Sequence, residues 1–241
     1  MTPRKPVLVE LPAVADASER LLALHAGHPD FYPAFLDSAA TGGALGRYSL
    51  LLAAPGSRLE LDRQGRLAGP GEGDRFCARL NAWWRAERGP PPPVPWPFAG
   101  GWFLYLGYEL AGEIEPTLEL PESPLELVAC AVRMSAAILL DHQTGGCVAI
   151  GEPGAVAAVR RLAADFADCR PLTDEATHPI AAAIVEDDPE HYLEACRRAL
   201  EHIAAGDVYQ ANLARSWRVS MPAGGSAAGL YRRLRKANPG A

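Results

Sequence analysis

Two pairs of strand-like segments, each joined by a short turn, constrain the fold of this chain more than any other feature. Residues 58–67 alternate between apolar and polar side chains around Gln64-Gly65, and residues 129–140 lead through a turn at 142–146 into 147–150. Short turns that contain glycine are typical of antiparallel hairpins. Because parallel strands need long crossover connections, this pattern predicts an antiparallel sheet and argues against a βαβ nucleotide-binding fold.

The remaining segments add further strands and helices to this sheet. Strands are predicted at 33–38, 47–54, 100–108 and 207–219. Helices are predicted at 17–26, 74–88, 155–167, 189–205 and 227–237. The proline-rich run 89–97 is expected to be an extended connector, because proline lacks the N–H that a helix or central strand needs. This order of elements predicts an α+β protein with helices layered on large, mostly antiparallel sheets.

The length and the distribution of polar residues predict two lobes. A chain of 241 residues suits one large domain or two small ones. Residues 168–188 are polar, contain two prolines and show no hydrophobic period, so we expect a linker there. The expected division is an N-terminal lobe at 1–167, the linker, and the start of an incomplete second lobe at 189–241.

The predicted helix 189–205 has the clearest signals in the chain. Asp188 is a good N-cap residue, Pro189 suits the first helical position, and Gly206 suits the C-terminal cap. Apolar residues recur at steps of three and four and predict one buried stripe. Its members are Leu193, Cys196, Leu200 and Ile203. We expect this stripe to pack against elements outside these 241 residues and otherwise to promote association.

Composition excludes several classes of function. The formal charge of −6 is spread without a basic block, which argues against nucleic-acid and anionic-membrane partners. The five cysteines are widely spaced and form no C-x-x-C pair, which fits idle thiols in a reducing compartment. No window of about 20 apolar residues predicts a membrane span, and no apolar leader follows the N-terminus. We therefore expect a cytoplasmic protein.

Polar residues that could bind a small molecule occur on the predicted strand 207–219. Gln210 and Asn212 lie two residues apart, so a strand would place both on one face. They are either ordinary solvent-facing amides or the lining of a ligand pocket that includes Tyr209. The glycine pairs match no phosphate loop, and no metal-ligand or catalytic constellation stands out.

The stretch Ile203-Ala-Ala-Gly-Asp-Val-Tyr-Gln-Ala-Asn-Leu213 resembles the chorismate-utilising enzyme family, whose members share a helix ending in Gly-Asp before Ile/Val-Tyr-Gln-x-Asn-Leu. Four further stretches agree in order, namely 35–38, 46–49, 98–109 and 230–239. Asn212-Leu213 is more similar to the aminodeoxychorismate synthase component I branch than to anthranilate synthase component I. In the second branch an aliphatic residue usually precedes the leucine.

The resemblance implies an enzyme with two closely packed lobes that contain large antiparallel sheets. Such an enzyme binds chorismate with Mg²⁺ and replaces its 4-hydroxyl group with ammonia from a glutamine amidotransferase subunit. The product, 4-amino-4-deoxychorismate, leads to p-aminobenzoate and folate. The alternatives are anthranilate synthase component I and, from another class, a non-catalytic module that binds tryptophan or docks a glutaminase.

The family's active site includes a Pro-Ile-Lys-Gly-Thr strand and glutamates that bind Mg²⁺, and neither motif occurs here. We therefore assign no catalytic residue and no metal ligand to this chain, and expect it to be inactive alone. Family members also carry a tryptophan site in the N-terminal lobe, inhibitory in anthranilate synthases and structural in some aminodeoxychorismate synthases. By resemblance this site involves Ser38, Leu45, Gly46, Arg47 and Tyr48, with Asn238 and Pro239 at its edge. Alternatively, Arg47-Tyr48 simply begins a strand.

Overall fold

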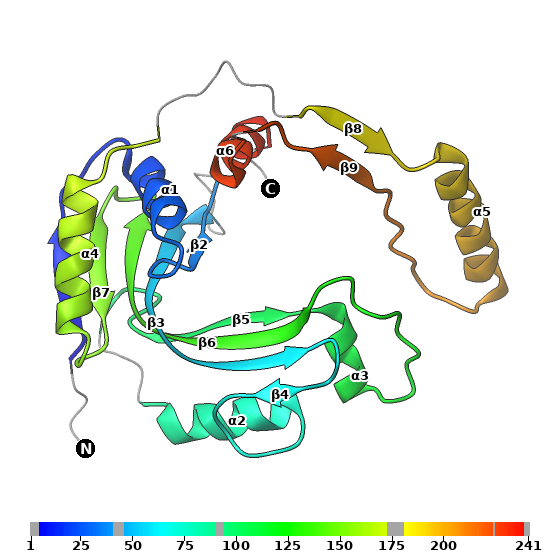
Figure 1. The fold of residues 1–241 in the computed structure, drawn as a ribbon, viewed down its shortest axis with the longest axis horizontal. Coiled ribbons are helices and arrows are strands. Elements are labelled where there is room, and N and C mark those ends of the chain that lie inside the picture. Colours follow the sequence, from blue (N-terminus) through cyan, green and yellow to red (C-terminus); the bar gives the residue numbers. More distant parts are fainter. Residues whose placement is uncertain (1–4, 41–45, 90–93, 173–180, 224, 239–241) are drawn as a thin grey trace. The chain divides into compact units, whose positions relative to one another are not determined.

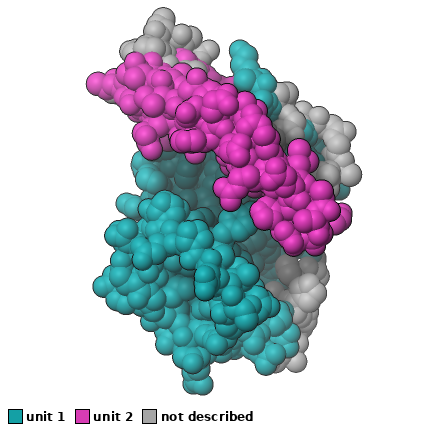
Figure 2. Space-filling view, turned by 90° about the vertical axis from the view of Figure 1, so that its right-hand side faces the viewer, with its two compact units in different colours: residues 1–173, 235–241 teal, residues 174–234 magenta. Residues whose placement is uncertain are grey.

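The computed structural model describes residues 5–40, 46–89, 94–172, 181–223 and 225–238. These residues belong to two compact units, which Figure 2 shows in different colours. The first unit comprises residues 1–173 together with 235–241, and the second comprises residues 174–234. Among the described residues, no helix combines the length and the apolar character needed to cross a bilayer.

A seven-stranded antiparallel sheet forms the centre of the first unit. Its strands run in the order β1-β7-β6-β3-β2, with β4 paired to β3 and β5 paired to β6. Their bounds are Val7–Leu11 (β1), Ala34–Leu36 (β2), Tyr48–Asp62 (β3), Leu67–Ala68 (β4), Gly101–Leu106 (β5), Leu127–Asp141 (β6) and Cys147–Gly151 (β7). The predicted α+β class with a mostly antiparallel sheet is confirmed.

The two longest strands, β3 and β6, are antiparallel partners along nearly their whole length, from Tyr48 opposite Asp141 to Asp62 opposite Leu127. The register shifts between Pro55 and Arg58, which marks a bulge. The prediction of two separate strands, one at 47–54 and one starting at 58, is therefore wrong. Proline cannot donate to a ladder, but a bulge accommodates it without ending the strand.

Helices cover the sheet in two places. Helix α1 (Ala17–Gly27) and helix α4 (Val156–Asp168) share one hydrophobic core with β1, β3, β6 and β7, and Figure 1 shows α4 beside β7. Helix α2 (Phe76–Glu87) packs Phe76 and Trp83 against the other end of β3 and β6. All three helices are confirmed within two residues, although Trp84, expected on the buried face of α2, is exposed.

The segment after β5 departs from the prediction. A strand was expected to reach Tyr108, but β5 ends at Leu106, and Tyr108–Leu110 form a 3₁₀ turn that leads into the short helix α3 (Ala111–Ile114). The partner strand explains this end, because the last β5 pair joins Leu106 to Ala129 near the beginning of β6. The expected connector 89–97 lies partly outside the described residues, and residues 94–97 form neither helix nor strand.

The second unit contains a two-stranded antiparallel sheet and the helix that was predicted most clearly. Strand β8 (Ala183–Glu186) pairs with β9 (Trp217–Ser220), and β8 lies inside the stretch 168–188 that was expected to be a linker. Helix α5 (Pro189–Ala205) is capped by the Asp188 carboxylate, which accepts from the Glu190 N–H at 3.0 Å. Gly206 ends α5 with a left-handed φ of 82°. Helix α6 (Ala227–Ala237) has its predicted bounds.

One expectation about the second unit is wrong, and a second agrees with the structure. Residues 207–216 do not form a strand, because all four residues of β8 pair with β9 and leave no ladder for the preceding segment among the described residues. The stripe on α5 is exposed, which agrees with the expectation that its packing partners lie outside these 241 residues. Leu193 and Ile203 are exposed, and Leu200 is 67% exposed. The apolar spacing was interpreted correctly, but this stripe has no covering element in the described part of the chain.

Candidate functional site

The residues predicted by resemblance to bind tryptophan lie at the junction between β2 and β3. Ser38 follows β2, while Gly46 and Arg47 lead into β3, whose first residue is Tyr48. Asn238 is exposed and follows α6. Leu45 and Pro239 lie outside the described residues.

Ser38 makes hydrogen bonds that hold this junction together. Its Oγ donates to the carbonyl oxygen of Tyr48 at 2.7 Å, and its backbone N–H donates to Ser49 Oγ at 3.0 Å. Side chain and backbone of Ser38 therefore both contact the start of β3. This pairing fixes Ser38 against the beginning of β3.

A series of hydrogen-bonded polar side chains extends from Ser49 toward the β6–β7 turn. The fully buried Ser49 hydroxyl donates to Asp37 Oδ1 at 2.7 Å and lies 2.8 Å from His142 Nε2. A hydroxyl has one proton, and Ser49 donates it to Asp37. Ser49 must therefore accept from His142, so we infer that the His142 ring carries its proton on Nε2. His142 also donates its backbone N–H to the Arg47 carbonyl oxygen at 2.8 Å.

An ion pair between Arg47 and Asp141 lies beside these hydrogen-bonded side chains. Arg47 donates through Nη2 to Asp141 Oδ2 at 2.8 Å and through Nε to both carboxylate oxygens at 3.2 Å. The hydrogen bonds from Arg47, together with one from the Gln143 N–H, hold the pKa of Asp141 at about 2. The Arg47 guanidinium also stacks over the Tyr48 ring at 4.7 Å. Tyr48 thus meets a cation on its face and approaches Trp96 with a ring separation of 6.2 Å.

The last turn of α6 adds a further charged group, the Arg235 guanidinium. Arg235 Nη1 donates to Asp37 Oδ2 at 2.7 Å and to Ser18 Oγ at 2.9 Å, and Nη2 donates to the Glu19 carboxylate. Arg235, Asp37, Ser18 and Glu19 all belong to the first unit. The bond to Asp37 joins positions 198 residues apart, next to the predicted site residue Ser38 and three residues before Asn238.

Sequence reasoning missed several members of this site, including Asp37, Ser49, Asp141, His142 and Arg235. Asp37, Ser49 and Arg235 lie inside the stretches 35–38, 46–49 and 230–239 that carried the resemblance, so those stretches held the signal. His142 lies in a turn and had no comparable signal. Only the fold brings β2, β3, the β6–β7 turn and α6 together.

The charged groups of this cluster bind one another. The Asp37 carboxylate, 2% exposed, accepts from Arg235 and Ser49, and Arg47 donates to Asp141. The Tyr48 ring adds an aromatic surface beside these groups. In the part of the chain that the structure describes, no group of three His, Cys, Asp or Glu side chains is placed to hold a metal ion.

The pocket-lining candidates in the second unit are arranged differently from the prediction. Tyr209 is 94% exposed, and both amides are exposed on a segment that is not a strand. Gln210 Nε2 donates to Asn212 Oδ1 at 3.2 Å, so the two side chains contact each other. This arrangement of Gln210 and Asn212 is that of ordinary surface amides.

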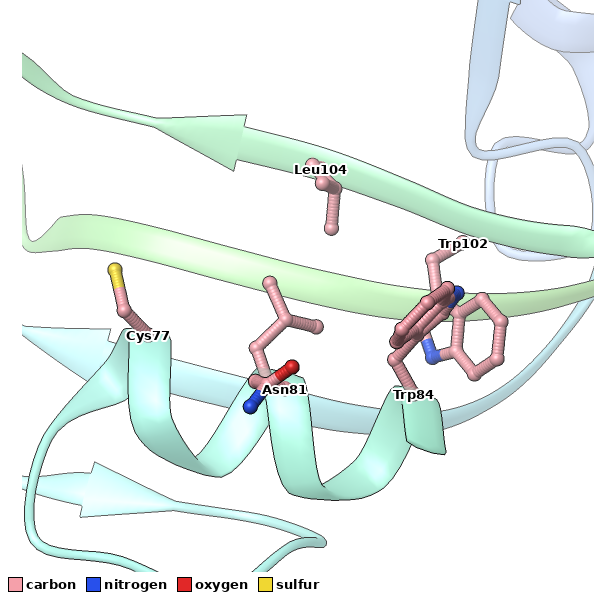
Figure 3. Close-up of a pocket in the computed structure, with 6 residues that line it drawn as sticks. Cys77, Asn81, Trp84, Trp102 and Leu104 are labelled. Carbon is pink, nitrogen blue, oxygen red and sulfur yellow. The ribbon is translucent and has the colours of Figure 1, made fainter. Parts of the chain in front are cut away.

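A separate cavity of about 440 Å³ lies between α2 and β5 (Figure 3). Its lining is mostly apolar and comprises Cys77, Leu80, Asn81, Trp84, Trp102 and Leu104. The Trp102 Nε1 atom is buried and has no hydrogen-bond partner among the described residues. Burial and the neighbouring Glu113 carboxylate raise the pKa of the Cys77 thiol, which therefore stays protonated at neutral pH. None of the residues predicted to bind a ligand lines this cavity.

Comparison with known proteins decides the family. Residues 56–241, about three quarters of the chain, match the family described as chorismate binding enzyme. The chain belongs to this family. It is also similar to anthranilate synthase component 1 of Streptomyces coelicolor (strain ATCC BAA-471 / A3(2) / M145), with 30% identity over 236 residues that cover 88% of this chain and 42% of the relative.

A solved structure agrees with this chorismate-binding fold. The chain resembles the crystal structure of anthranilate synthase component I from Streptococcus pneumoniae TIGR4, with a TM-score of 0.62 and 19% sequence identity. The similarity covers 82% of this chain and 47% of that one. At this identity the likeness supports the fold alone. The chain spans less than half the length of either relative.

Proposed function

We propose that this chain is the N-terminal part of component I of an aminodeoxychorismate synthase. In the proposed reaction, ammonia replaces the 4-hydroxyl group of chorismate, and 4-amino-4-deoxychorismate and water form. Membership of the chorismate-binding family carries the proposal, because it defines the substrate. The resemblance of Asn212-Leu213 to the aminodeoxychorismate branch supports this product.

Anthranilate synthase component I is the second candidate. The relatives from Streptomyces coelicolor and Streptococcus pneumoniae both carry that name, and this observation favours it. The shared portion covers 42% and 47% of those relatives, and the resemblance places the lysine strand and the metal-binding glutamates outside this portion. Similarity in the shared portion therefore does not decide between 4-amino-4-deoxychorismate and anthranilate as the product.

The proposed enzyme requires a glutamine amidotransferase subunit to supply ammonia, and Mg²⁺ to bind chorismate. The described residues do not fit a magnesium site, since no three candidate ligand side chains converge among them. We therefore assign no step of the reaction to a metal held by this chain. The proposed contribution of these residues is to bind an amino acid and to begin the chorismate-binding lobe.

The proposed amino acid ligand is L-tryptophan, bound at the junction of β2 and β3. Ser38, Gly46, Arg47 and Tyr48 are the described residues of this proposed site, together with Asn238 at its edge. Leu45 and Pro239 complete the set by resemblance. The Tyr48 ring offers an aromatic surface, and the partly exposed Arg47 guanidinium offers donors to a carboxylate, which supports an aromatic amino acid as the ligand.

The product assay requires a protein restored to the length of its relatives. With chorismate, ammonium and Mg²⁺, we expect 4-amino-4-deoxychorismate, measured as p-aminobenzoate after coupling to a lyase. Anthranilate as the main product, measured by its fluorescence, would replace the first candidate with the second. No consumption of chorismate would contradict both candidates.

The chain of 241 residues provides the matched control for this assay. We expect it to form neither product, because the lysine strand and the metal-binding glutamates implied by the resemblance do not occur in it. Turnover above background would contradict the proposed division of roles. Calorimetric binding of L-tryptophan to this chain without turnover would support the alternative of another class, in which it acts as a binding module.

A further inference from the structure

We propose that Arg235 is a positioning residue that fastens the last turn of α6 to the β2–β3 junction and thereby organises the amino acid site. Arg235 acts through Asp37, which lies next to Ser38. The part of this proposal that concerns ligand affinity rests on the proposed L-tryptophan site. The part that concerns fastening of α6 stands independently of any ligand.

The Arg235 guanidinium contacts side chains from two different elements. Its guanidinium donates to Asp37 and Ser18 through Nη1 and to Glu19 through Nη2. Ser18 and Glu19 lie in the first turn of α1, and Asp37 directly follows β2. One planar side chain thus binds two elements of the first unit at once. Lysine would supply the charge but not the same fork of donors.

Burial strengthens the ion pair between Arg235 and Asp37. The Asp37 side chain is 2% exposed and the Arg235 side chain is 15% exposed. A pair that is shielded from water is screened much less than a surface pair, and removal of the cation leaves a carboxylate in a site that disfavours its charge. By contrast, Lys236 on the next position of α6 is exposed. Lys236 therefore provides a matched control.

Asp37 transmits the position of Arg235 to Ser38. Its Oδ2 accepts from Arg235, and its Oδ1 accepts from Ser49 at 2.7 Å. The Ser49 hydroxyl in turn accepts from the Ser38 N–H at 3.0 Å. This continuous set of hydrogen bonds links α6 to the first predicted ligand-binding residue. Asn238, at the other edge of the predicted site, follows Arg235 by three residues. The contacts of Arg235 therefore also restrict the position of Asn238.

The direct test measures amide hydrogen exchange in the 241-residue chain without ligand. We expect Arg235→Gln to accelerate exchange at least tenfold in the last turn of α6 and around Ser38. Asp37→Asn should produce the same pattern, and the double variant should add nothing beyond either single one. Lys236→Gln should leave both segments unchanged. Equal exchange in Arg235→Gln and Lys236→Gln, or additive effects in the double variant, would overturn the proposal.

A second pair of variants keeps the test valid if Arg235→Gln does not fold. Arg235→Lys replaces the guanidinium with an ammonium and keeps the charge. Lys236→Arg makes the reverse replacement at the neighbouring exposed position. We expect faster exchange, about fivefold, in the former variant only. Wild-type exchange rates in Arg235→Lys would contradict the requirement for a planar guanidinium.

Calorimetry with L-tryptophan separates this proposal from the proposed function. Folded Arg235→Gln should bind L-tryptophan at least fivefold more weakly than wild type, while Lys236→Gln should bind it equally well. Equal affinity in wild type and Arg235→Gln would overturn the role of Arg235 in organising the site. If the wild-type chain does not bind L-tryptophan, the amino acid site and its organisation by Arg235 both fail, and the exchange experiment still decides the fastening of α6.

Discussion

Gly46 lies so close to Ala40 that a Cβ atom on Gly46 would stand 1.8 Å from the Ala40 carbonyl oxygen. The obstacle is backbone, so it cannot move aside as the end of a flexible side chain does. We therefore predict that Gly46→Ala distorts the β2–β3 junction and lowers the free energy of unfolding by about 2–4 kcal/mol. Urea denaturation followed by circular dichroism measures this loss.

Gly27→Ala is the control for Gly46→Ala. Gly27 is the last residue of α1, and a Cβ atom there would meet no atom within 4 Å. Alanine restricts the unfolded chain and favours helix, so we expect stability to be unchanged or increased by up to about 1 kcal/mol. Similar losses in the two variants would show that Gly46 has no special steric role.

The Arg47–Asp141 pair predicts a pH dependence of stability. The pKa of Asp141 is about 2 in the folded chain against an ordinary value of 3.8. Because folding lowers this pKa, the contribution is fully present above about pH 4 and is lost as pH falls toward 2. We expect about 1–2 kcal/mol, less than the full shift implies, since Arg47 is partly exposed to solvent screening.

Urea denaturation between pH 6 and pH 3 tests this dependence. The stability difference between wild type and Asp141→Asn should shrink as the pH falls. Asp30→Asn, at an exposed aspartate, should track the wild type throughout. A difference between wild type and Asp141→Asn that stays constant with pH would argue against the ion pair as its cause.

Two leucines test the contrast between the core and the exposed face of α5. Leu162 on α4 is fully buried, whereas Leu200 on α5 is 67% exposed. We expect Leu162→Ala to lower the free energy of unfolding by about 2–5 kcal/mol because it leaves a cavity. Leu200→Ala should change it by less than about 0.5 kcal/mol. Equal losses would mean that α5 is covered in solution.

The same exposed face predicts self-association of the 241-residue chain. Leu193, Leu200 and Ile203 present adjacent apolar side chains on α5. Light scattering over a range of concentrations should show oligomers, and Leu200→Lys should shift the distribution toward monomer. Glu201→Lys makes a charge change at an exposed neighbour and should not disperse the oligomers. A wild-type monomer at all concentrations would contradict this prediction.

Substitution of Asn212 distinguishes two roles of its side chain, a surface amide and a ligand-binding amide. In the described structure Asn212 is exposed and accepts a hydrogen bond from Gln210. We expect Asn212→Val to change the stability of the 241-residue chain by less than about 0.5 kcal/mol. In the restored protein, a loss of activity of roughly 5- to 150-fold would instead identify a ligand contact, since a stranded buried partner costs about 1–3 kcal/mol.

Elements with local signals were predictable from the sequence. Asp188, Pro189 and Gly206 determine both ends of α5 through contacts within a few residues, and the bounds of α6 were equally accurate. The segment 207–219 shows the limit of such signals. Alternation describes a strand only when a partner exists, and partners are set by distant segments. The exposed stripe on α5 is a similar case, because periodicity marks an apolar face but not what covers it.

The candidate site was predictable only in part, for a related reason. The stretches around Ser38 and Tyr48 were identified by resemblance, and the structure places both at one junction. Whether these residues bind tryptophan stays a prediction. The polar network that joins Asp37 to His142 and Arg235 depends on the approach of segments about 100 and 200 residues away. No local pattern in the sequence reports such distances.

Strand β1 pairs with β7, which places Leu11 opposite Cys147 and Val7 opposite Gly151. During synthesis, the first strand therefore emerges about 140 residues before its partner. At roughly 5–20 residues per second, this interval lasts about 7–28 s. For that time the apolar side chains of β1 have no partner strand, and the core beneath α4 cannot close. The sheet is therefore completed only after nearly the whole first unit has been synthesised.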